Sequence, residues 1–337
     1  MHKFSRITIF LKHQLRFLAA AALLPVLESG EEAPLVGGQA VLEGVMMRSP
    51  HAWGIAVRKE SGEMVTHSEV MESPKDKRKW LGWPFVRGLV TLGSALSLGY
   101  RALQFSTNVM LEEEQKDIAP EKRIQFQGWL MWVNVIFSIA FLIVMYKFLP
   151  LLITTKLESR YAGLGNHVIF AGVEGLIRVS IFLTFMWLLS QAKDIYRLFQ
   201  FHGGEHKTVF NFESGEEVNV ANAQKWPTFH PRCGTSFLMT LMLLFIPIYM
   251  VLPKYDFWTN FGIRIVMLVF MSSISYEVIR LAARNRSGVF AIMTQPGLWL
   301  QRITTKPPDD TQVACAIRAL DEAFALEKQR GGELTIA

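Results

Sequence analysis

The sequence predicts an α-helical membrane protein with about four transmembrane helices, further interfacial helices and a small antiparallel β unit near the N-terminus. Half of the 337 residues are hydrophobic, and the mean hydropathy is positive. The apolar residues gather in uninterrupted blocks, which is typical of membrane spans rather than of a soluble core. Two distant cysteines imply no disulfide framework. The basic residues behind the net charge of +6 are concentrated in the segments between the apolar blocks. The expected partner is therefore a lipid bilayer and not a nucleic acid.

The first two segments differ in composition. Residues 1–36 begin with basic residues and no acidic residue before Glu28, and they include an apolar run, which favours a basic amphipathic anchor lying on the membrane. Residues 37–73 are glycine-rich at first, and hydrophobic residues then alternate over 53–57 and 64–70, as in strands. This small β unit is expected to pack under the histidine site described below and to lend it Glu43.

Residues 74–125 contain a charged linker, a helical pattern over 85–110 and a charged connector. Arg87 and Arg101 leave thirteen uncharged residues between them, which span roughly 20 Å at 1.5 Å per residue. The hydrocarbon core is ~30 Å thick. This helix is therefore expected to be interfacial or re-entrant.

The membrane domain is expected over residues 126–282, with four stretches long enough to cross. They cover residues 128–145, 168–189, 236–252 and 262–278. Tryptophans near their ends fit interfacial belts. Lysine and arginine are dense before the first stretch, in the large loop 190–235 and after the last stretch, so the positive-inside rule places both termini and that loop in the cytoplasm. Residues 283–337 are expected to form cytoplasmic C-terminal helices.

Ionisable residues also lie within the predicted spans. Glu174 and Arg178 stand four apart, and Glu277 closes the last span. Such groups are costly in a membrane and usually face the bundle interior in pairs. A structural ion-pair cluster is favoured over a proton path.

The loop 190–235 carries the residues with metal-ligating chemistry. His202 and His206 stand four apart, one turn apart on a helix, with Glu205 beside them. The order His-x-x-Glu-His is that of inverted zincins, in which both histidines bind zinc and the glutamate is the base. Gly203 and Gly204 weaken a helix by roughly 1 kcal/mol each, although they permit close approach of backbone or substrate.

A third ligand must come from elsewhere in the chain. His230 and Cys233 are the main candidates, because imidazole and thiolate both suit zinc. Glu213 and Glu216 are weaker candidates. The expected cofactor is a divalent metal, zinc by its donor set, with Glu205 as general base. The alternative is that these histidines are interfacial side chains with no ligand.

Six ordered motifs add a resemblance that covers roughly residues 36–326. They are GGQAVLEGVMMR at 37–48, WPFVRG at 83–88, HGGEHK at 202–207, HPRCGTSFL at 230–238, SYE at 275–277 and LQRITTKPPDD at 300–310. With these motifs the chain resembles the YqhQ-like family of bacterial membrane proteins, a family of unknown function described as predicted metal-dependent enzymes. The resemblance implies a multi-span protein of the bacterial cytoplasmic (inner) membrane. Its signature residues map to His202, Glu205, His206, His230 and Cys233, and it implies no substrate. Where the family has a glutamate before the final Pro-Asp-Asp, this chain has Pro307, so that motif is given no catalytic role.

Three functional classes remain open. The first is a metal-dependent enzyme, a hydrolase of unknown substrate, with Glu205 as its catalytic base. The second is a non-catalytic scaffold, in which four protein ligands fill every coordination position of the metal and hold the loop in place. The third is a transporter or lipid-handling protein that uses Glu174 and Glu277, although no inverted repeat supports it.

Overall fold

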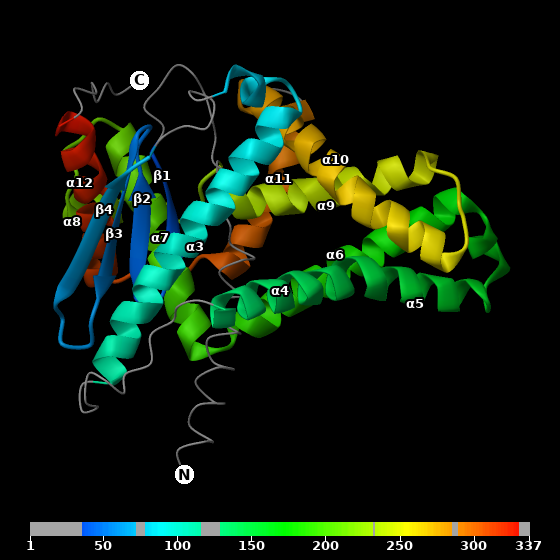
Figure 1. The fold of residues 1–337 in the computed structure, drawn as a ribbon, viewed down its shortest axis with the longest axis horizontal. Helices are drawn as coiled ribbons and strands as arrows, with labels where there is room; N and C mark the ends of the chain where they lie inside the picture. Colours follow the sequence, from blue (N-terminus) through cyan, green and yellow to red (C-terminus); the bar gives the residue numbers. More distant parts are fainter. Residues whose placement is uncertain (1–35, 72–77, 116–128, 232, 285–288, 330–337) are drawn as a thin grey trace, which may run out of the picture.

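The computed structural model describes residues 36–71, 78–115, 129–231, 233–284 and 289–329. It confirms a mostly helical chain with a small antiparallel sheet near the N-terminus. The sheet and three helices form a packed module, and the apolar helices extend from it as a long arm (Figure 1). Residues 1–35 of the expected amphipathic segment, the linker 72–77 and the connector 116–128 lie outside the described residues.

Four strands form the sheet in the order β1-β2-β3-β4, each antiparallel to the next. They are β1 (Gly37–Val41), β2 (Gly44–Arg48), β3 (Ala52–Arg58) and β4 (Met64–Val70). The glycine-rich strip expected over 37–48 is therefore a hairpin, whose turn contains Glu43 at a φ of 50°. The turn between β3 and β4 contains Gly62 at a φ of 88°, a left-handed conformation that glycine adopts without strain.

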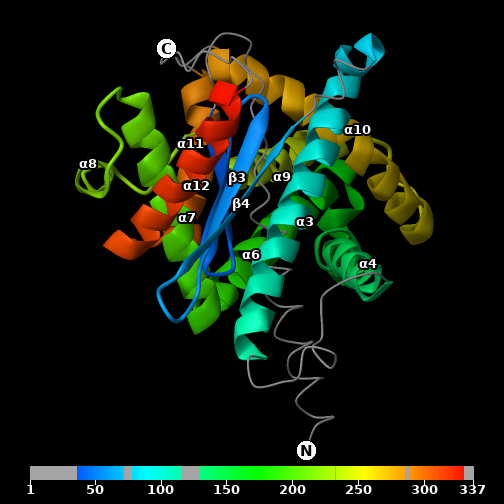
Figure 2. The same cartoon turned by 60° about the vertical axis from the view of Figure 1, so that its left-hand side comes forward.

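Helices cover both faces of the sheet (Figure 2). Helix α3 (Val86–Glu114) packs on one face, where Met46, Trp53 and Ile55 point. Helices α7 (Lys193–Glu213) and α12 (Asp310–Gln329) pack on the other face. Successive strand residues point to opposite faces, so a sheet buried on both sides needs apolar residues at every position.

Helix α12 approaches the sheet so closely that β3 needs a glycine. A Cβ atom at Gly54 would lie 2.5 Å from the carbonyl oxygen of Ala319 and 2.7 Å from the amide nitrogen of Ala323. These atoms are backbone and cannot rotate away. The absent side chain therefore sets the distance between the sheet and α12.

The far end of α12 is held by a buried carboxylate. Glu327 accepts hydrogen bonds from the Ser49 hydroxyl at 2.6 Å and from the His51 amide at 3.0 Å, and it contacts His51 Nδ1 at 2.7 Å. Burial alone would raise the pKa of Glu327, but these hydrogen bonds outweigh it and hold the pKa below the ordinary 4.5.

Replacing Glu327 with alanine is expected to lower the free energy of unfolding by about 1–3 kcal/mol at neutral pH, because three donors lose their partner. A group with a lowered folded-state pKa stabilises above its unfolded pKa, and this contribution disappears as the pH falls through the folded value. The difference in melting temperature between wild type and Glu327→Ala should therefore shrink below about pH 4.5. Glu63→Ala, at an exposed pair with Lys59, is the control and should change little.

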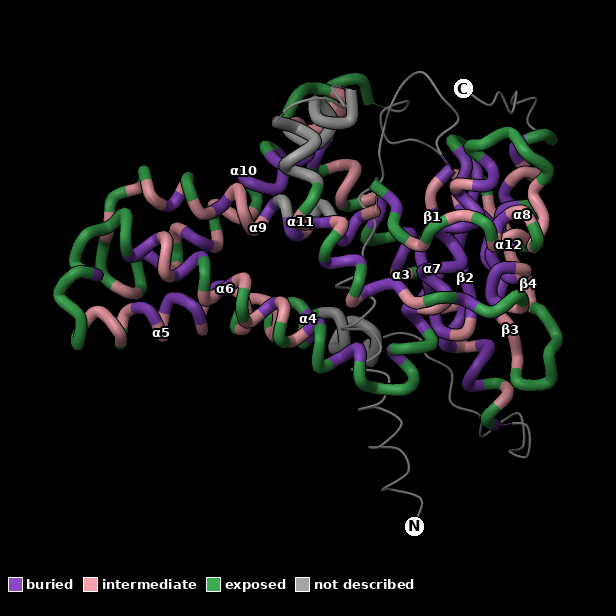
Figure 3. The backbone as a smooth tube through the Cα atoms, turned by 180° about the vertical axis from the view of Figure 1, so that it is seen from behind, coloured by how far each residue is buried: buried purple, intermediate pink, exposed green. Residues whose placement is uncertain are grey.

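The arm consists of long apolar helices and their connections. They are α4 (Trp129–Ile143), the π-helical turn η3 (Val144–Phe148), α5 (Leu149–Glu158), α6 (His167–Ser190), α9 (Gly234–Val251), α10 (Phe257–Arg284) and α11 (Val289–Thr304). Much of the surface of the arm is exposed or half-buried, in contrast to the buried strands of the module (Figure 3). Only 22–33% of each most apolar window is buried within the protein, so most of this apolar surface needs a non-polar surrounding.

Among the described residues, three helices are long and apolar enough to cross a membrane, whereas the sequence predicted four. They are Ile136–Glu158, His167–Ser190 and Phe257–Glu277. The stretch expected at 236–252 falls in α9, where the described residues give a shorter apolar helical segment, Leu241–Val251. The first span also extends beyond the predicted end at Met145, because the charged Lys147 is buried against an aromatic ring and the helix continues through η3 and α5.

The segment 190–235 is not the loop that the sequence predicted. Its first half is α7, a helix of 21 residues, most of them buried, and a short helix α8 (Val220–Gln224) follows. Helix α7 packs against both the sheet and α12. The residues expected on a polar loop therefore lie on a helix in the core of the module.

The two glutamates predicted within the spans belong to separate groups. Glu174 contacts Arg178 and Arg264, whereas Glu277 contacts Arg87 of α3. Arg264 and Glu277 lie on the same helix, thirteen positions apart, which corresponds to about 20 Å. The two glutamates are thus parts of different ion pairs.

Candidate metal centre

Helix α7 carries His202, Glu205 and His206 on neighbouring turns, and the two glycines between them let other backbone segments approach the helix closely. A Cβ atom at Gly203 would lie 2.2 Å from the carbonyl oxygen of Lys306, whereas one at Gly204 would meet the Gln312 carbonyl oxygen at 3.3 Å. The helix therefore accepts the unfavourable propensity of Gly203, because only glycine lets the chain cross at this point.

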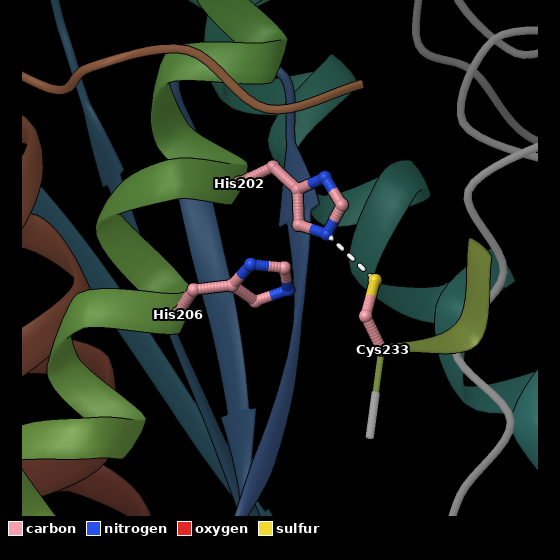
Figure 4. A group of neighbouring side chains, drawn as sticks. All are labelled: His202, His206 and Cys233. Atoms are coloured by element: carbon pink, nitrogen blue, oxygen red, sulfur yellow. Dashed lines mark hydrogen bonds between the residues drawn. The ribbon is translucent and has the colours of Figure 1, made fainter. Parts of the chain in front are cut away.

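The side chains of His202, His206 and Cys233 converge on one small space (Figure 4). One ligand atom from each residue lies within 4.8 Å of the others, and both histidines are buried. Cys233 precedes the first turn of α9 as its N-cap residue, and its sulfur lies 3.3 Å from His202 Nε2 and 3.1 Å from the Thr235 hydroxyl. Two imidazoles and a thiol at this spacing are a donor set that suits zinc.

Backbone carbonyls orient both imidazole rings. His202 Nδ1 lies 2.8 Å from the Thr304 carbonyl oxygen, and His206 Nδ1 contacts the Thr228 carbonyl oxygen. A carbonyl can only accept a hydrogen bond, so each Nδ1 must carry the proton and each neutral ring has its lone pair on Nε2. Metal-binding histidines commonly have this second contact, which fixes the tautomer and the ring orientation. The Nε2 lone pairs of His202 and His206 are therefore both available to bind one shared cation.

Glu205 lies beside this centre and is almost completely buried. Its Oε2 atom is 3.9 Å from His202 Nε2 and 3.7 Å from His206 Nε2, too far for a direct hydrogen bond. Burial raises the pKa of Glu205, while His202, His230 and a hydrogen bond from the Gly38 backbone act in the opposite direction. The carboxylate is close enough to reach the centre through one water molecule.

Burial is also the main influence on the histidines. It lowers the pKa of His202, opposed by Glu205 and the Thr304 carbonyl, and it lowers the pKa of His206, opposed chiefly by Cys233. Both rings therefore favour the neutral form, which is the form that binds metal.

The structure places His230 next to this group and not within it. Its ring centroid lies 5.6 Å from that of His206 and 4.4 Å from that of Phe210, and its Nε2 atom lies 3.7 Å from the Glu213 carboxylate. The Gln301 side chain of α11 holds the His230 backbone through two hydrogen bonds, at 2.7 and 2.8 Å. His230 thus lies against His206, outside the group formed by His202, His206 and Cys233.

The remaining acidic candidates lie away from the cluster. Glu43 forms a bidentate ion pair with Arg197 on α7, so it is not lent to the histidine site as the sequence analysis expected. The β unit does reach the site, but through Gly38, where a Cβ atom would lie 2.6 Å from Glu205 Cγ. Glu216 is exposed beyond the end of α7.

Comparison with known proteins identifies the family. A family model described as "Protein of unknown function (DUF1385)" matches residues 83–326, which include all the residues of the cluster. The chain belongs to this family. It is also 28% identical over 304 residues to a Bacillus subtilis (strain 168) protein named "Uncharacterized protein YqhQ", an alignment that covers 87% of this chain and 93% of that protein. No solved structure matches the chain.

This membership in the DUF1385 family confirms the resemblance seen in the motifs, while the contacts that orient the cluster were not visible in the sequence. The carbonyl groups of Thr304 and Thr228 and the amide of Gln301 were all missed. Gln301 and Thr304 belong to the motif at 300–310, one of the six motifs that carry the family resemblance. Their place in that motif was the signal in the sequence that could have pointed to them. A backbone carbonyl has no residue-type signature and could not have been found in this way.

Proposed function

We propose that this chain is an integral protein of the bacterial cytoplasmic membrane, with a metal centre on its cytoplasmic side. The three long apolar helices support membrane insertion. Lysine and arginine are dense in the cluster-bearing segment and after α10, which supports the cytoplasmic orientation. The centre would then lie in the packed module next to the membrane.

The metal is assigned to His202, His206 and Cys233, with zinc as the ion that suits this donor set. The observation that carries the assignment is the pair of Nε2 lone pairs, each fixed by a carbonyl behind its ring and each facing the same thiol. When bound, zinc supplies Lewis acidity and makes a nearby water molecule more acidic. Glu205 is the general base in this proposal, because its carboxylate borders the same space without occupying a ligand position.

Three protein ligands support catalysis more than a purely structural role. Structural zinc sites are usually closed by four protein ligands, whereas catalytic sites keep one position for water or substrate. His230, the fourth residue expected from the sequence, contacts Glu213 and Phe210 beside the group. The reaction class that fits an open position and a neighbouring carboxylate is metal-dependent hydrolysis.

The test compares wild type with Glu205→Gln in the full chain purified in detergent. Metal per chain is counted by elemental analysis, and hydrolysis is measured on peptide, ester and phosphodiester probes. The variant should keep its metal and lose about 10²–10⁴-fold in rate, as expected for removal of a general base. Glu216→Gln makes the same change at an exposed position and should alter neither quantity. Loss of metal in Glu205→Gln would make Glu205 a ligand and contradict its role as base.

A further inference from the structure

The arm contains a second cluster of charged residues, far from the proposed metal centre along its helices. Glu174 of α6 is completely buried and contacts both Arg178, one turn further on, and Arg264 of α10. Arg264 Nε lies 2.9 and 3.1 Å from the two carboxylate oxygens of Glu174. Lys147 lies beside this group in the π-helical turn η3, with its Nζ atom 3.5 Å from the Tyr249 hydroxyl. Such π-helical turns are frequent at functional sites.

The cluster has more positive than negative charge. Arginine stays protonated in proteins, so Arg178 and Arg264 together exceed the single charge of Glu174 even before Lys147 is counted. Within the described part of the chain, Glu174 is the carboxylate that these arginines contact. Asp256, which lies nearby in sequence, instead accepts hydrogen bonds from the amides at the start of α10. The group therefore holds at least one excess positive charge in an apolar bundle.

Aromatic rings compensate for only part of this charge. The guanidinium carbons of Arg264 and Arg178 lie 4.9 and 5.3 Å from the centre of the Tyr249 ring, and Lys147 Nζ lies 3.8 Å from the centre of the Phe245 ring. A cation–π contact is weaker than the cost of removing an ion from water. One nitrogen of Arg178, Nη1, is also buried without a hydrogen-bond partner among the described residues. These observations point to a second anion at this site.

A cavity leads from the surface to the cluster. Buried Arg264 and Asn260 line its inner part together with Tyr249, and exposed His167 and Pro253 lie at its rim. Lys254 also lines the rim, but it is paired with Glu158, so the excess charge belongs to the inner part. The cavity therefore offers a small anion a route to the Arg264 guanidinium.

The depth of the cluster matches the boundary between headgroups and hydrocarbon. Glu174 and Arg264 each come seven residues after the first residue of their helices, which corresponds to roughly 10 Å. The polar layer of a bilayer is about 5–8 Å thick on each side of the hydrocarbon core. A headgroup above the cavity would need to reach only slightly inward to meet Arg264.

We propose that this cavity binds a phosphate-type oxyanion, with Arg264 as its main contact and with Arg178 supplying further positive charge. Glu174 accepts from Nε and Nη2 of Arg264, and the Asn260 carbonyl oxygen accepts from Nη1, which leaves one further hydrogen on each Nη nitrogen for an oxyanion. Such paired hydrogens of a planar guanidinium match the geometry of phosphate oxygens. The oxyanion comes either from a phospholipid headgroup or from free phosphate, and the two sources differ in whether acyl chains are required.

The experiment uses the full chain, delipidated in neutral detergent, and native mass spectrometry. Phosphatidylglycerol is compared with diacylglycerol of the same acyl chains, which lacks the phosphate. Preferential binding of phosphatidylglycerol, at least about tenfold, supports the site with a lipid source. If inorganic phosphate raises the melting temperature more than chloride of equal ionic strength and phosphatidylglycerol shows no preference, the site takes free phosphate. Binding of neither probe overturns the proposal.

Two variants locate the binding site. Arg264→Lys keeps a positive charge for Glu174 but loses the paired hydrogen bonds, and it should weaken binding about tenfold. Arg87→Lys makes the same change in the ion pair at the other end of α10 and should leave binding unchanged. If Arg264→Lys does not elute as a single folded species, Arg178→Lys, which keeps a cation beside Glu174 but loses the buried Nη1 donor, should weaken binding instead. Unchanged binding in the folded variants would overturn the proposal.

Discussion

Replacing His206 with alanine is expected to remove the bound metal, from about one ion per chain in the wild type to a level below detection. In the proposed centre the ring supplies one of three ligands, and its Nδ1 contact with the Thr228 carbonyl holds it in place. Losing a contact behind a ligand already weakens metal binding 10–100-fold, so losing the ligand itself should weaken it by more than about 100-fold. Elemental analysis of the purified full chain measures this directly.

Two other histidines serve as comparisons for this result. His167→Ala removes an exposed imidazole at the start of α6 and should leave the metal content unchanged. His230→Ala should also retain the metal if three ligands suffice, whereas loss of metal in this variant would favour a closed four-ligand scaffold over an enzyme. A wild-type protein without metal, even after reconstitution with zinc, would contradict the metal centre altogether.

Replacing Gly203 with alanine is expected to destabilise the module by about 3 kcal/mol or more, although alanine favours helix more than glycine does. The new Cβ atom would lie 2.2 Å from the Lys306 carbonyl oxygen, so the backbone after α11 would have to move. The Thr304 carbonyl that orients His202 is two residues away in the same segment. The melting temperature and the metal content should therefore fall together.

Alanine substitutions at two other glycines serve as comparisons for the loss of stability in Gly203→Ala. Gly204→Ala meets the Gln312 carbonyl oxygen at 3.3 Å and should destabilise the protein less. Gly93→Ala adds a methyl group to an exposed position of α3 with nothing within 4 Å, and it should be neutral or stabilise by up to about 1 kcal/mol. Equal melting temperatures for Gly203→Ala and Gly93→Ala would contradict the close crossing at Gly203.

The sequence alone was sufficient for features of the structure that depend on residues close to one another in the chain. Apolar blocks predicted the helical arm, because a membrane-type helix must be apolar along its whole length. Alternation over 64–70 predicted a strand, because successive side chains point to opposite faces. The four-residue spacing of His202 and His206 predicted their shared side of a helix, and the ring centroids are indeed 4.4 Å apart.

Local patterns failed where burial by distant segments decides the outcome. The segment 190–235 contains glycines and charged residues and was expected to be a polar loop between two spans, helical at most over 199–210, but the sheet and α12 enclose its first half as the longer helix α7. Lys147 lies within an apolar helix because Phe245 and Tyr249 of α9 cover its ammonium group. Neither environment is visible from neighbours along the chain.

The tertiary structure alone shows which of the two candidate side chains, His230 or Cys233, lies together with the histidine pair. His230 and Cys233 are three residues apart, and either could follow α7 in sequence with suitable chemistry. Gln301 of α11 holds the backbone of His230, whereas the start of α9 brings the Cys233 sulfur to His202. The residue types determined which chemistry was available, and the packing of α9 and α11 around α7 decided which side chains meet, because contacts between distant segments depend on the whole fold.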